Sequence, residues 1–380
     1  MGERKSSHIE IGWAPDIMQV YRGKRVLVTG HTGFKGAWLA TWLLKLGATV
    51  YGYALPPDEP SLYQSLGLAG EVTERYGDIC DEGGLRELVR LARPDIVFHL
   101  AGVSTIAASL HDPDRAFHVN AGGFANLLSV AQELGTAGSI VCVTSDKCYR
   151  PSAVPHREDD QLGFGDPYSA SKATVELVVS AYQLQDRLRP LVATARSGNV
   201  IGGGDWIRGR LVPDVVRACM ESGKLGLRNP QAVRPWQHVL DVINGYLILG
   251  RELLAGNEKY ARPYNFGPDP DQHWRVADVV NSLVSHLGTR IDIFSDDAAL
   301  KECEDIHLLL DSQAAVIDLG WAPAWNAQRA VAETAAWYLE SYRREHRKML
   351  SESLMQIDDF TGSGRHEIHW PCDSRDGNDR

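Results

Sequence analysis

The chain has 380 residues, with 39 Lys plus Arg against 49 Asp plus Glu, so its formal net charge is −10. Its 44% hydrophobic and 23% charged residues are typical of globular proteins and exclude a largely disordered chain or a fibrous repeat. The acidic balance argues against nucleic acid or an anionic membrane surface as the main partner. The sequence has no uninterrupted apolar run of about 18 residues, so no membrane span is expected.

The six cysteines show none of the short CxxC spacings of a zinc or redox site. We therefore expect reduced thiols in a reducing compartment and no metal centre. The charged N-terminal residues are not followed by the apolar stretch of a secretion signal. Together these features predict a cytoplasmic protein.

In the first 200 residues short apolar runs alternate with helical patterns. Strands are expected at 24–29, 49–53, 95–100, 139–143 and 191–196, and the first helix at 37–46. Strands that alternate with helices predict an α/β fold, with a Rossmann-type, doubly wound parallel sheet.

After residue 200 the pattern becomes richer in loops, with helices expected at 211–221, 276–287 and 330–344. We expect an N-terminal extension at 1–20, the sheet domain with the catalytic residues at 21–200 and a smaller, mainly substrate-binding region at 201–345. Residues 346–380 should hold the end of a helix and a disordered tail, because Gly, Ser, Asp, Arg and His dominate from 361 onward.

The first chemical motif is the glycine triplet Gly30, Gly33 and Gly36, which follows a strand and opens a helix. Glycines there allow a tight turn and a close approach to a pyrophosphate, and the helix N-terminus offers free N–H groups. The alternative is a plain strand-to-helix turn. Its position between strand and helix favours a dinucleotide site in the domain at 21–200.

The choice between NAD and NADP depends on the residue that reads the adenosine ribose. An acid should end the second strand about 18 residues past Gly36, but Ala54 stands there, and no arginine nearby could hold a 2′-phosphate. We therefore expect NAD. Asp78 follows the next strand region and could accept from the adenine amino group, or it could be a helix cap or turn residue.

Tyr168 and Lys172 lie four positions apart, on one face of a predicted helix. An ammonium near a phenol should lower the pKa of the phenol and make Tyr168 a usable base near neutral pH. Lys172 could also hydrogen-bond the nicotinamide ribose. The alternative is an exposed helical pair, but the preceding glycine turn and the strand end at Thr144 favour a catalytic pair.

Taken together, these motifs resemble the extended short-chain dehydrogenase/reductases that act on nucleotide sugars, and most of all their CDP-glucose 4,6-dehydratases. The resemblance covers roughly residues 20–345. It rests on the segments 30–36, 144–149, 166–169, 198–206, 228–230, 234–239, 264–268 and 319–321. It implies that the cofactor is held by Gly30, Thr32, Gly33, Phe34, Lys35, Gly36, Asp78, Ile79, Leu100, Ala101, Gly102, Tyr168 and Lys172.

The resemblance also implies roles for three residues that follow the expected strand at 139–143 in the sequence. Ser145 would bond the C4 hydroxyl of the sugar beside Tyr168, and Asp146 would be the general acid toward the departing C6 hydroxyl. Lys147 stands where related dTDP-glucose enzymes carry a glutamate base, and we hypothesise that it removes the C5 proton. From the residues alone, a solvated loop pair is the alternative for Asp146 and Lys147.

A late group of arginines suggests an anion site. The resemblance implies that Arg234 holds the substrate pyrophosphate, which suits a guanidinium fork. Arg210 and Arg228 are weaker candidates, since a lone arginine is often a solvated surface charge. Asn199 and His238 are further substrate-side candidates, although His238 could equally be structural.

One stretch departs from the family. Its members commonly carry Ala-Gln-Pro-Leu-Val-Arg after the fourth strand, whereas residues 102–107 read Gly-Val-Ser-Thr-Ile-Ala. This change leaves open a different nucleotide-sugar enzyme on the same scaffold, such as a 4-epimerase, a uronate decarboxylase or a reductase. A non-catalytic NAD-binding protein is a further alternative. The resemblance implies a homodimer and a CDP-hexose substrate.

Overall fold

The computed structural model describes residues 17–363, apart from 136, 153, 164, 185–189, 270, 271, 273 and 296–308. Residues 1–16 of the expected N-terminal extension and 364–380 of the expected tail lie outside this part. In the described part, no helix is long and apolar enough to cross a membrane.

The centre of the molecule is a seven-stranded sheet in the order β10-β6-β5-β4-β1-β2-β3, and every neighbouring pair is parallel. The strand order reverses between β1 and β4, so the crevice at their carboxyl ends is where ligands bind in such sheets. The bounds are β1 Arg25–Thr29, β2 Thr49–Ala54, β3 Thr73–Tyr76, β4 Ile96–His99, β5 Ser139–Val143, β6 Leu191–Ser197 and β10 Tyr264–Phe266.

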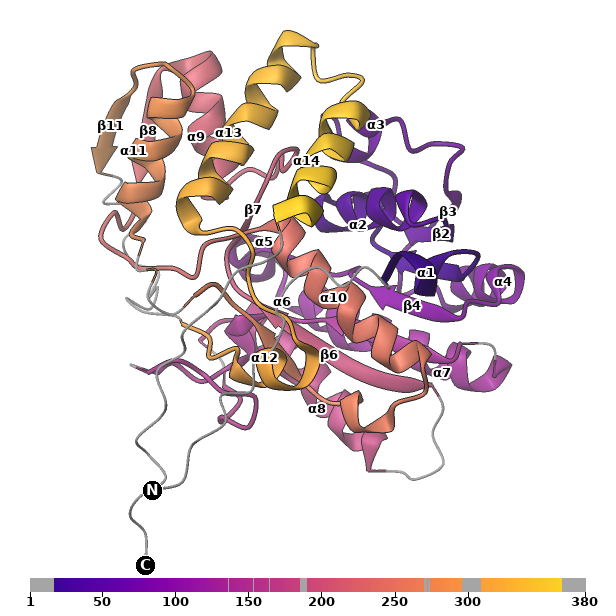
Figure 1. The fold of residues 1–380 in the computed structure, drawn as a ribbon. Helices are drawn as coiled ribbons and strands as arrows, with labels where there is room; N and C mark the ends of the chain where they lie inside the picture. The colour runs from indigo at the N-terminus through magenta and orange to yellow at the C-terminus, as the bar shows by residue number, and fades with distance from the viewer. Residues whose placement is uncertain are drawn as a thin grey trace, which may run out of the picture.

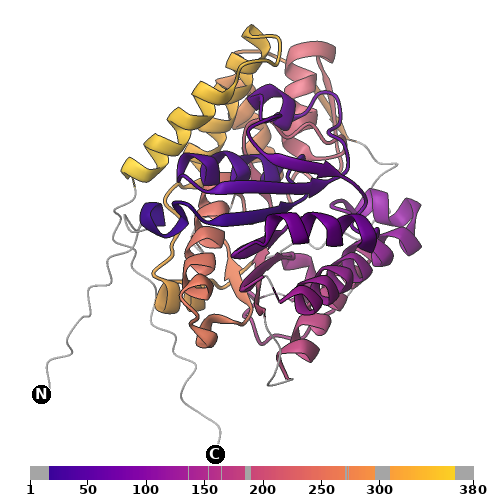
Figure 2. The same cartoon turned by 90° about the vertical axis from the view of Figure 1, so that its right-hand side faces the viewer.

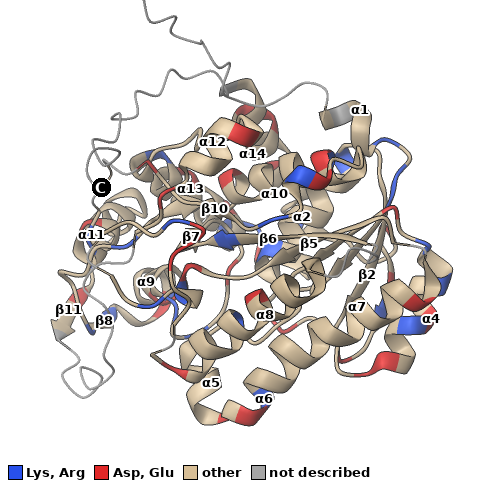
Figure 3. Cartoon of the chain, turned by 90° about the horizontal axis from the view of Figure 1, so that it is seen from below, with Lys and Arg blue, Asp and Glu red and all other residues tan. Residues whose placement is uncertain are grey.

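Helices cover both faces of this sheet, as Figure 3 shows in a view along its edge. One face carries α1 (Ile17–Tyr21), α2 (Phe34–Lys45) and α10 (Val239–Leu254), and the other carries α4 (Glu82–Ala92), α7 (Gly123–Leu134) and α8 (Pro167–Gln183). The strands β1, β4 and β5 are almost wholly buried, which matches the continuous apolar runs expected of a doubly covered parallel sheet.

Shorter elements connect or extend these layers. Around the sheet lie α3 (Leu62–Leu66), α5 (Ile106–His111), α6 (Pro113–Phe117), the π-helix η1 (His118–Gly122), the 3₁₀ turns η2 (Asp146–Cys148) and η4 (Glu258–Tyr260), and α12 (Gln313–Leu319). The pair β7 (Val200–Ile201) and β9 (Gln237–His238) is a separate two-stranded parallel sheet.

A smaller region lies to one side of the sheet (Figure 1). It contains α9 (Leu211–Arg217), the π-helix η3 (Ala218–Ser222), the parallel pair β8 (Lys224–Leu227) and β11 (Asp292–Ser295), and α11 (Val276–His286). The helix α13 (Ala327–Arg343) packs against α11 and β9. This region provides the loops that face the crevice.

The chain crosses the expected boundary at residue 200. After the loops that follow β6, it returns to the sheet as α10 and β10, and β10 pairs with β6. Residues 239–266 therefore belong to the layered sheet unit rather than to the smaller region. The cause is the apolar character of α10, of which 13 residues are buried.

The segment after 345 contains a further helix, α14 (Leu350–Ser363), which packs against α2, α3 and α13. Figure 2 shows it in yellow on the α2 side of the molecule. Its residues Ile357 and Phe360 are buried, and Phe360 meets Trp42 and Trp325 edge to face. These contacts order a helix in a stretch for which we expected only a helix end and a tail.

Candidate active site

The turn between β1 and α2 is built for a close approach of backbone. Gly30 has φ +75°, and a Cβ on it would lie 2.8 Å from the backbone nitrogen of Ala101. A Cβ on Gly36 would lie 2.0 Å from the carbonyl oxygen of Gly30. Gly33 is the N-cap of α2 and no side chain caps this helix, so its N-terminus stays open toward an anion.

The end of β4 meets this turn. The backbone N–H groups of Leu100 and Ala101 both donate to the hydroxyl of Thr29, each at 3.2 Å. A Cβ on Gly102 would lie 2.6 Å from Oδ1 of Asn120 and 3.5 Å from Nζ of Lys172, so glycine lets the chain pass close to both side chains. The expected cofactor residues of the two loops therefore lie together at the switch point of the sheet.

The other expected cofactor residues lie around these loops. The carboxylate of Asp78 pairs with Arg115 at 2.9 Å and accepts from the N–H of Cys80. Burial would raise the pKa of Asp78, but these two hydrogen bonds keep it below its ordinary value. The side chain of Ile79 is buried against Gly123, Phe34 belongs to the core, and the hydroxyl of Thr32 donates to the carbonyl of Leu55.

Lys35 is partly buried at the start of α2. Burial and the positive charges of Lys172 and Arg210 lower its pKa to about 7, although Asp146 and Asp205 oppose this shift. Its amino group therefore lies among the charged groups of the crevice.

The helix α8 presents the Tyr and Lys pair. Asp166 caps it by accepting from the N–H of Ser169 at 2.9 Å, and Pro167 occupies the first turn, which fixes where the helix begins. Tyr168 and Lys172 are both buried, at 9% and 8% exposure. The ammonium of Lys172 donates to the carbonyl of Val143 at 3.3 Å.

The pKa of Tyr168 corrects one expectation. Burial raises it to about 12, while a hydrogen bond with Ser145 and the charge of Arg210 act in the opposite direction. We expected Lys172 to lower this pKa below its ordinary value, but burial outweighs the favourable charges around the phenol. In the protein without ligands Tyr168 is therefore protonated at neutral pH.

The 3₁₀ turn η2 shortly after β5 and its N-cap Ser145 carry the three other expected catalytic residues. The hydroxyl of Ser145 bonds the carboxylate of Asp146 at 3.0 Å and accepts from the N–H of Lys147. Asp146 is 3% exposed, and its second carboxylate oxygen has no partner in the described part of the chain. Burial raises the pKa of Asp146, and the charges of Lys147 and Arg234 oppose this rise.

Two of the three arginines lie close together. Arg210 pairs with the buried Asp205 at 2.9 Å and donates to the hydroxyl of Ser104, also at 2.9 Å. Arg228 approaches the carbonyl of Gly209, next to Arg210. Arg234 is 6% exposed, and its charge acts on Asp146. Arg210, whose charge acts on Tyr168, and Arg234 thus border the crevice that Tyr168 and Asp146 face.

Asn199 and His238 occupy different settings. Asn199 is half-buried in the loop after β6, and its carbonyl accepts from the N–H of Gln237. His238 is fully buried at the N-cap of α10, where its ring lies 4.7 Å from Trp325 and 6.4 Å from Trp38. Burial lowers its pKa to about 3. The structure therefore gives His238 a place in the core and not beside the crevice.

The structure adds four residues to the site, of which sequence reasoning noted only Ser104, as part of the altered stretch at 102–107. Arg115 forms an ion pair with Asp78, and Asp205 forms one with Arg210. Ser104, on the opposite loop, accepts a hydrogen bond from Arg210. Glu176 lies beneath the catalytic residues and accepts from Thr144. Asp205 could have been found from the Gly-Gly-Gly-Asp-Trp run, but Arg115 and Glu176 carry no local signal.

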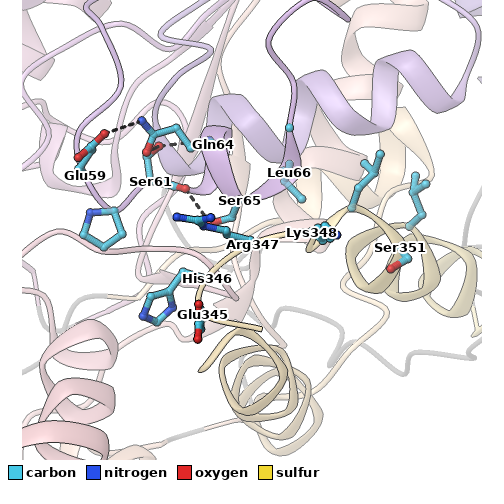
Figure 4. Close-up of a pocket in the computed structure, with 14 residues that line it drawn as sticks. Glu59, Ser61, Gln64, Ser65, Leu66, Glu345, His346, Arg347, Lys348 and Ser351 are labelled. Atoms are coloured by element: carbon cyan, nitrogen blue, oxygen red, sulfur yellow. Dashed lines mark hydrogen bonds between the residues drawn. The ribbon is translucent and has the colours of Figure 1, made fainter. Parts of the chain in front are cut away.

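A pocket between α3 and the turn from α13 to α14 lies apart from these residues (Figure 4). Pro60, Leu66 and Leu354 contribute apolar walls, while Arg347 and Lys348 bring positive charge. None of the expected site residues lines it. In the described part of the chain, no group of three or more His, Cys, Asp or Glu side chains could hold a metal ion.

The fold and the site define a class of protein. A parallel sheet ordered 3-2-1-4-5-6-10, a glycine turn at its switch point and a Tyr–Lys pair beside that turn describe a dinucleotide-dependent enzyme of the Rossmann type. Residues 26–267 match the model of the NAD dependent epimerase/dehydratase family, and the chain belongs to this family. The glycine cradle, which a Cβ at 30 or 36 would fill, fits the NAD on which the family depends.

Individual relatives agree with this. The chain is 36% identical over 351 residues to the CDP-glucose 4,6-dehydratase of Salmonella typhimurium, covering 90% of this chain and 97% of the relative. It is 29% identical to the dTDP-glucose 4,6-dehydratase of Streptomyces griseus, with 82% and 93% covered. Its structure is similar to that of DesIV, a dTDP-glucose 4,6-dehydratase from Streptomyces venezuelae with NAD and TYD bound, with a TM-score of 0.71, 26% identity and coverage of 86% and 99%.

Proposed function

We propose that the protein is an NAD-dependent 4,6-dehydratase that converts CDP-glucose to CDP-4-keto-6-deoxyglucose. The observation that carries the proposal is the acid-bearing turn η2 beside the Tyr–Lys helix: Ser145 and Asp146 lie next to Tyr168. Oxidation at C4 needs only the Tyr–Lys pair, whereas loss of water across C5 and C6 also needs an acid and a base. The 36% identity to a CDP-glucose 4,6-dehydratase supports the same activity.

The bound cofactor would supply the chemistry of a hydride acceptor and donor, which makes the overall reaction redox-neutral. The protein's own residues would do the rest. Tyr168, bonded to Ser145, would take the proton of the C4 hydroxyl in its phenolate form, and Lys172 would stay close to it on the next helical turn. The C4 ketone so formed acidifies the hydrogen on C5.

The elimination step would use the turn η2. Lys147 would remove the C5 proton in its neutral form, and Asp146 would give a proton to the C6 hydroxyl, which leaves as water. An acid must hold its proton near neutral pH for this task, and the buried setting of Asp146 raises its pKa in that direction. Arg210, Arg228 and Arg234 would hold the pyrophosphate of the substrate.

The test is incubation of the purified protein with CDP-glucose. The expected product is lighter than the substrate by one water, carries a 4-keto group and forms with no net consumption of cofactor. If folded, NAD-loaded protein leaves CDP-glucose intact, the assignment is refuted. A panel of other nucleotide sugars would then test a 4-epimerase, reductase or decarboxylase, which the altered stretch at 102–107 keeps as the alternative.

We further propose a cytoplasmic homodimer. Several large apolar side chains are exposed on the α5, α6 and α8 side of the molecule: Leu110, Phe117 and Leu177. Leu177 lies nine positions after Tyr168, on the opposite face of α8, so a partner subunit could cover it without closing the crevice. Light scattering should give twice the monomer mass of 41.9 kDa, and Leu177→Glu should reduce it.

A further inference from the structure

Beneath the catalytic turn, residues 145–148, lies a buried ion pair that the proposed dehydration does not use. Glu176 stands on α8 one turn after Lys172, and Arg196 stands on β6. Their charged groups meet at 2.8 Å, and the two side chains are only 2% and 3% exposed. Further hydrogen bonds help to stabilise two buried charges of this kind, although Nε of Arg196 has no hydrogen-bond partner in the described part of the chain.

The carboxylate of Glu176 receives those bonds from both neighbouring strands. The hydroxyl of Thr144, directly after β5, donates to one oxygen. The hydroxyl of Thr194, on β6, donates to the other at 2.7 Å. Thr144 is the residue immediately before Ser145, so one end of the catalytic turn is tied to α8.

The other end of the turn is tied to the same pair. The guanidinium of Arg196 donates to the hydroxyl of Tyr149 at 2.6 Å, and Tyr149 directly follows the turn. Tyr149 in turn donates to the side chain of Asn265 on β10 at 2.7 Å. The turn at 145–148 is therefore held at both ends by side chains that converge on Glu176 and Arg196.

We propose that Glu176 is a positioning residue, which holds the catalytic turn at a fixed place against the Tyr168 and Lys172 face of α8. The role rests on the proposed function, because it concerns how the acid and the base reach the same sugar. Misplacement of a reacting group by about 1 Å costs on the order of a hundredfold in rate. A clamp at both ends of this short turn prevents such drift.

Two threonines offer a matched comparison. Thr144→Val and Thr194→Val each remove one hydroxyl that donates to Glu176, both sites are buried, and valine keeps the shape of threonine. Only Thr144 adjoins the catalytic turn. We expect Thr144→Val to lower kcat by about tenfold to a hundredfold with KM within about threefold of the parent, while Thr194→Val keeps both within about threefold.

A second measurement needs no substrate. Hydrogen exchange of a peptide that contains residues 145–149 should become faster in Thr144→Val and stay unchanged in Thr194→Val. If the parent enzyme leaves CDP-glucose intact, the proposed function fails, but this exchange difference still tests the clamp. Equal kcat and equal exchange in the two variants would overturn the proposal, even if both variants unfold at the same lowered temperature.

Charge gives an independent readout. Burial lowers the pKa of Lys172 and the carboxylate of Glu176 opposes this, so Glu176→Gln should move the alkaline limb of the kcat profile to lower pH. An alkaline limb that stays at the same pH in Glu176→Gln would contradict any role of Glu176 beyond packing. Asp241→Asn, at a buried carboxylate on α10 remote from Lys172, is the control. The other titratable groups that act on Lys172 are Lys35, His99, Cys142 and Cys148.

Discussion

The guanidinium of Arg210 donates to the hydroxyl of Ser104 at 2.9 Å and to its carbonyl at 3.3 Å, across 106 positions of sequence. The same guanidinium pairs with Asp205 at 2.9 Å. Arg210 thus joins the loop after β4 to the loop after β7, on both sides of the crevice. Ser104 belongs to the stretch at 102–107 in which this chain departs from the family pattern. This altered stretch therefore makes a direct hydrogen bond with Arg210.

Ser104→Ala should weaken substrate binding more than turnover. The variant loses the shorter of the two bonds from Ser104 and frees Arg210 to swing, so we expect KM to rise by about threefold to tenfold with kcat within about twofold. Steady-state kinetics with CDP-glucose measure this. Ser152→Ala, at a half-buried loop serine, serves as the control. An unchanged KM would show that Arg210 keeps its place without the hydroxyl.

Tyr168→Phe tests the proton acceptor. We expect kcat to fall by about a thousandfold, because the phenol is the only group of the pair that can take the C4 proton. NAD affinity should stay within about threefold, since the ring remains in place. The measurements are kcat and a titration with NAD. A variant that keeps a tenth of the activity would place the base elsewhere.

Much of the sheet follows from sequence because parallel strands covered on both faces are apolar throughout. The strands β1, β2, β4, β5 and β6 all stand within a residue or so of their expected bounds. Two strands carry weaker signals: β3 is polar and mostly exposed, and β10 has only three residues. The helix α14 is stabilised by tertiary contacts of residues such as Phe360, which no local pattern reveals.

The site divides in the same way. A four-residue spacing is enough to put Tyr168 and Lys172 on one helix face, and a glycine triplet is enough to mark a tight turn. Long-range pairs such as Arg210 with Ser104 depend on how loops far apart in the chain meet, so spacing could not predict them. His238 shows the reverse case. It lies four positions after Arg234 in the sequence, yet its side chain is buried in the core.

Asp146→Asn should remove activity and alter the pH dependence of stability. The amide cannot donate the proton that C6 needs, so we expect kcat to fall by about a hundredfold or more. Burial raises the pKa of Asp146 above its ordinary 3.8, so the folded state holds the proton more tightly than the unfolded chain. The parent therefore loses stability as the pH rises from 3.8 through the raised pKa.

The asparagine variant has no such loss. Its Tm relative to the parent should therefore rise as the pH increases above 3.8, over a range that thermal unfolding at a series of pH values covers. A constant Tm difference over this range would mean that the carboxyl of Asp146 titrates alike in the folded and unfolded states.

Lys35→Met gives the matching test for a buried base. The pKa of Lys35 is lowered from 10.5 to about 7 by burial and by the charges of Lys172 and Arg210. Between pH 7 and pH 10.5 the unfolded chain binds more protons than the folded one, so the parent gains stability as the pH rises through this window. At and below pH 7 the lysine carries its full cost.

Lys35→Met should accordingly raise the Tm of the ligand-free protein by about 2 °C or more at pH 7. The gain should shrink as the pH approaches 10.5, where the parent no longer holds an unfavourable charge. Lys224→Met, at an exposed lysine on β8, should change Tm little at any pH. A gain for Lys35→Met that stays the same at alkaline pH would come from packing, and would contradict the placement of its amine among Lys172 and Arg210.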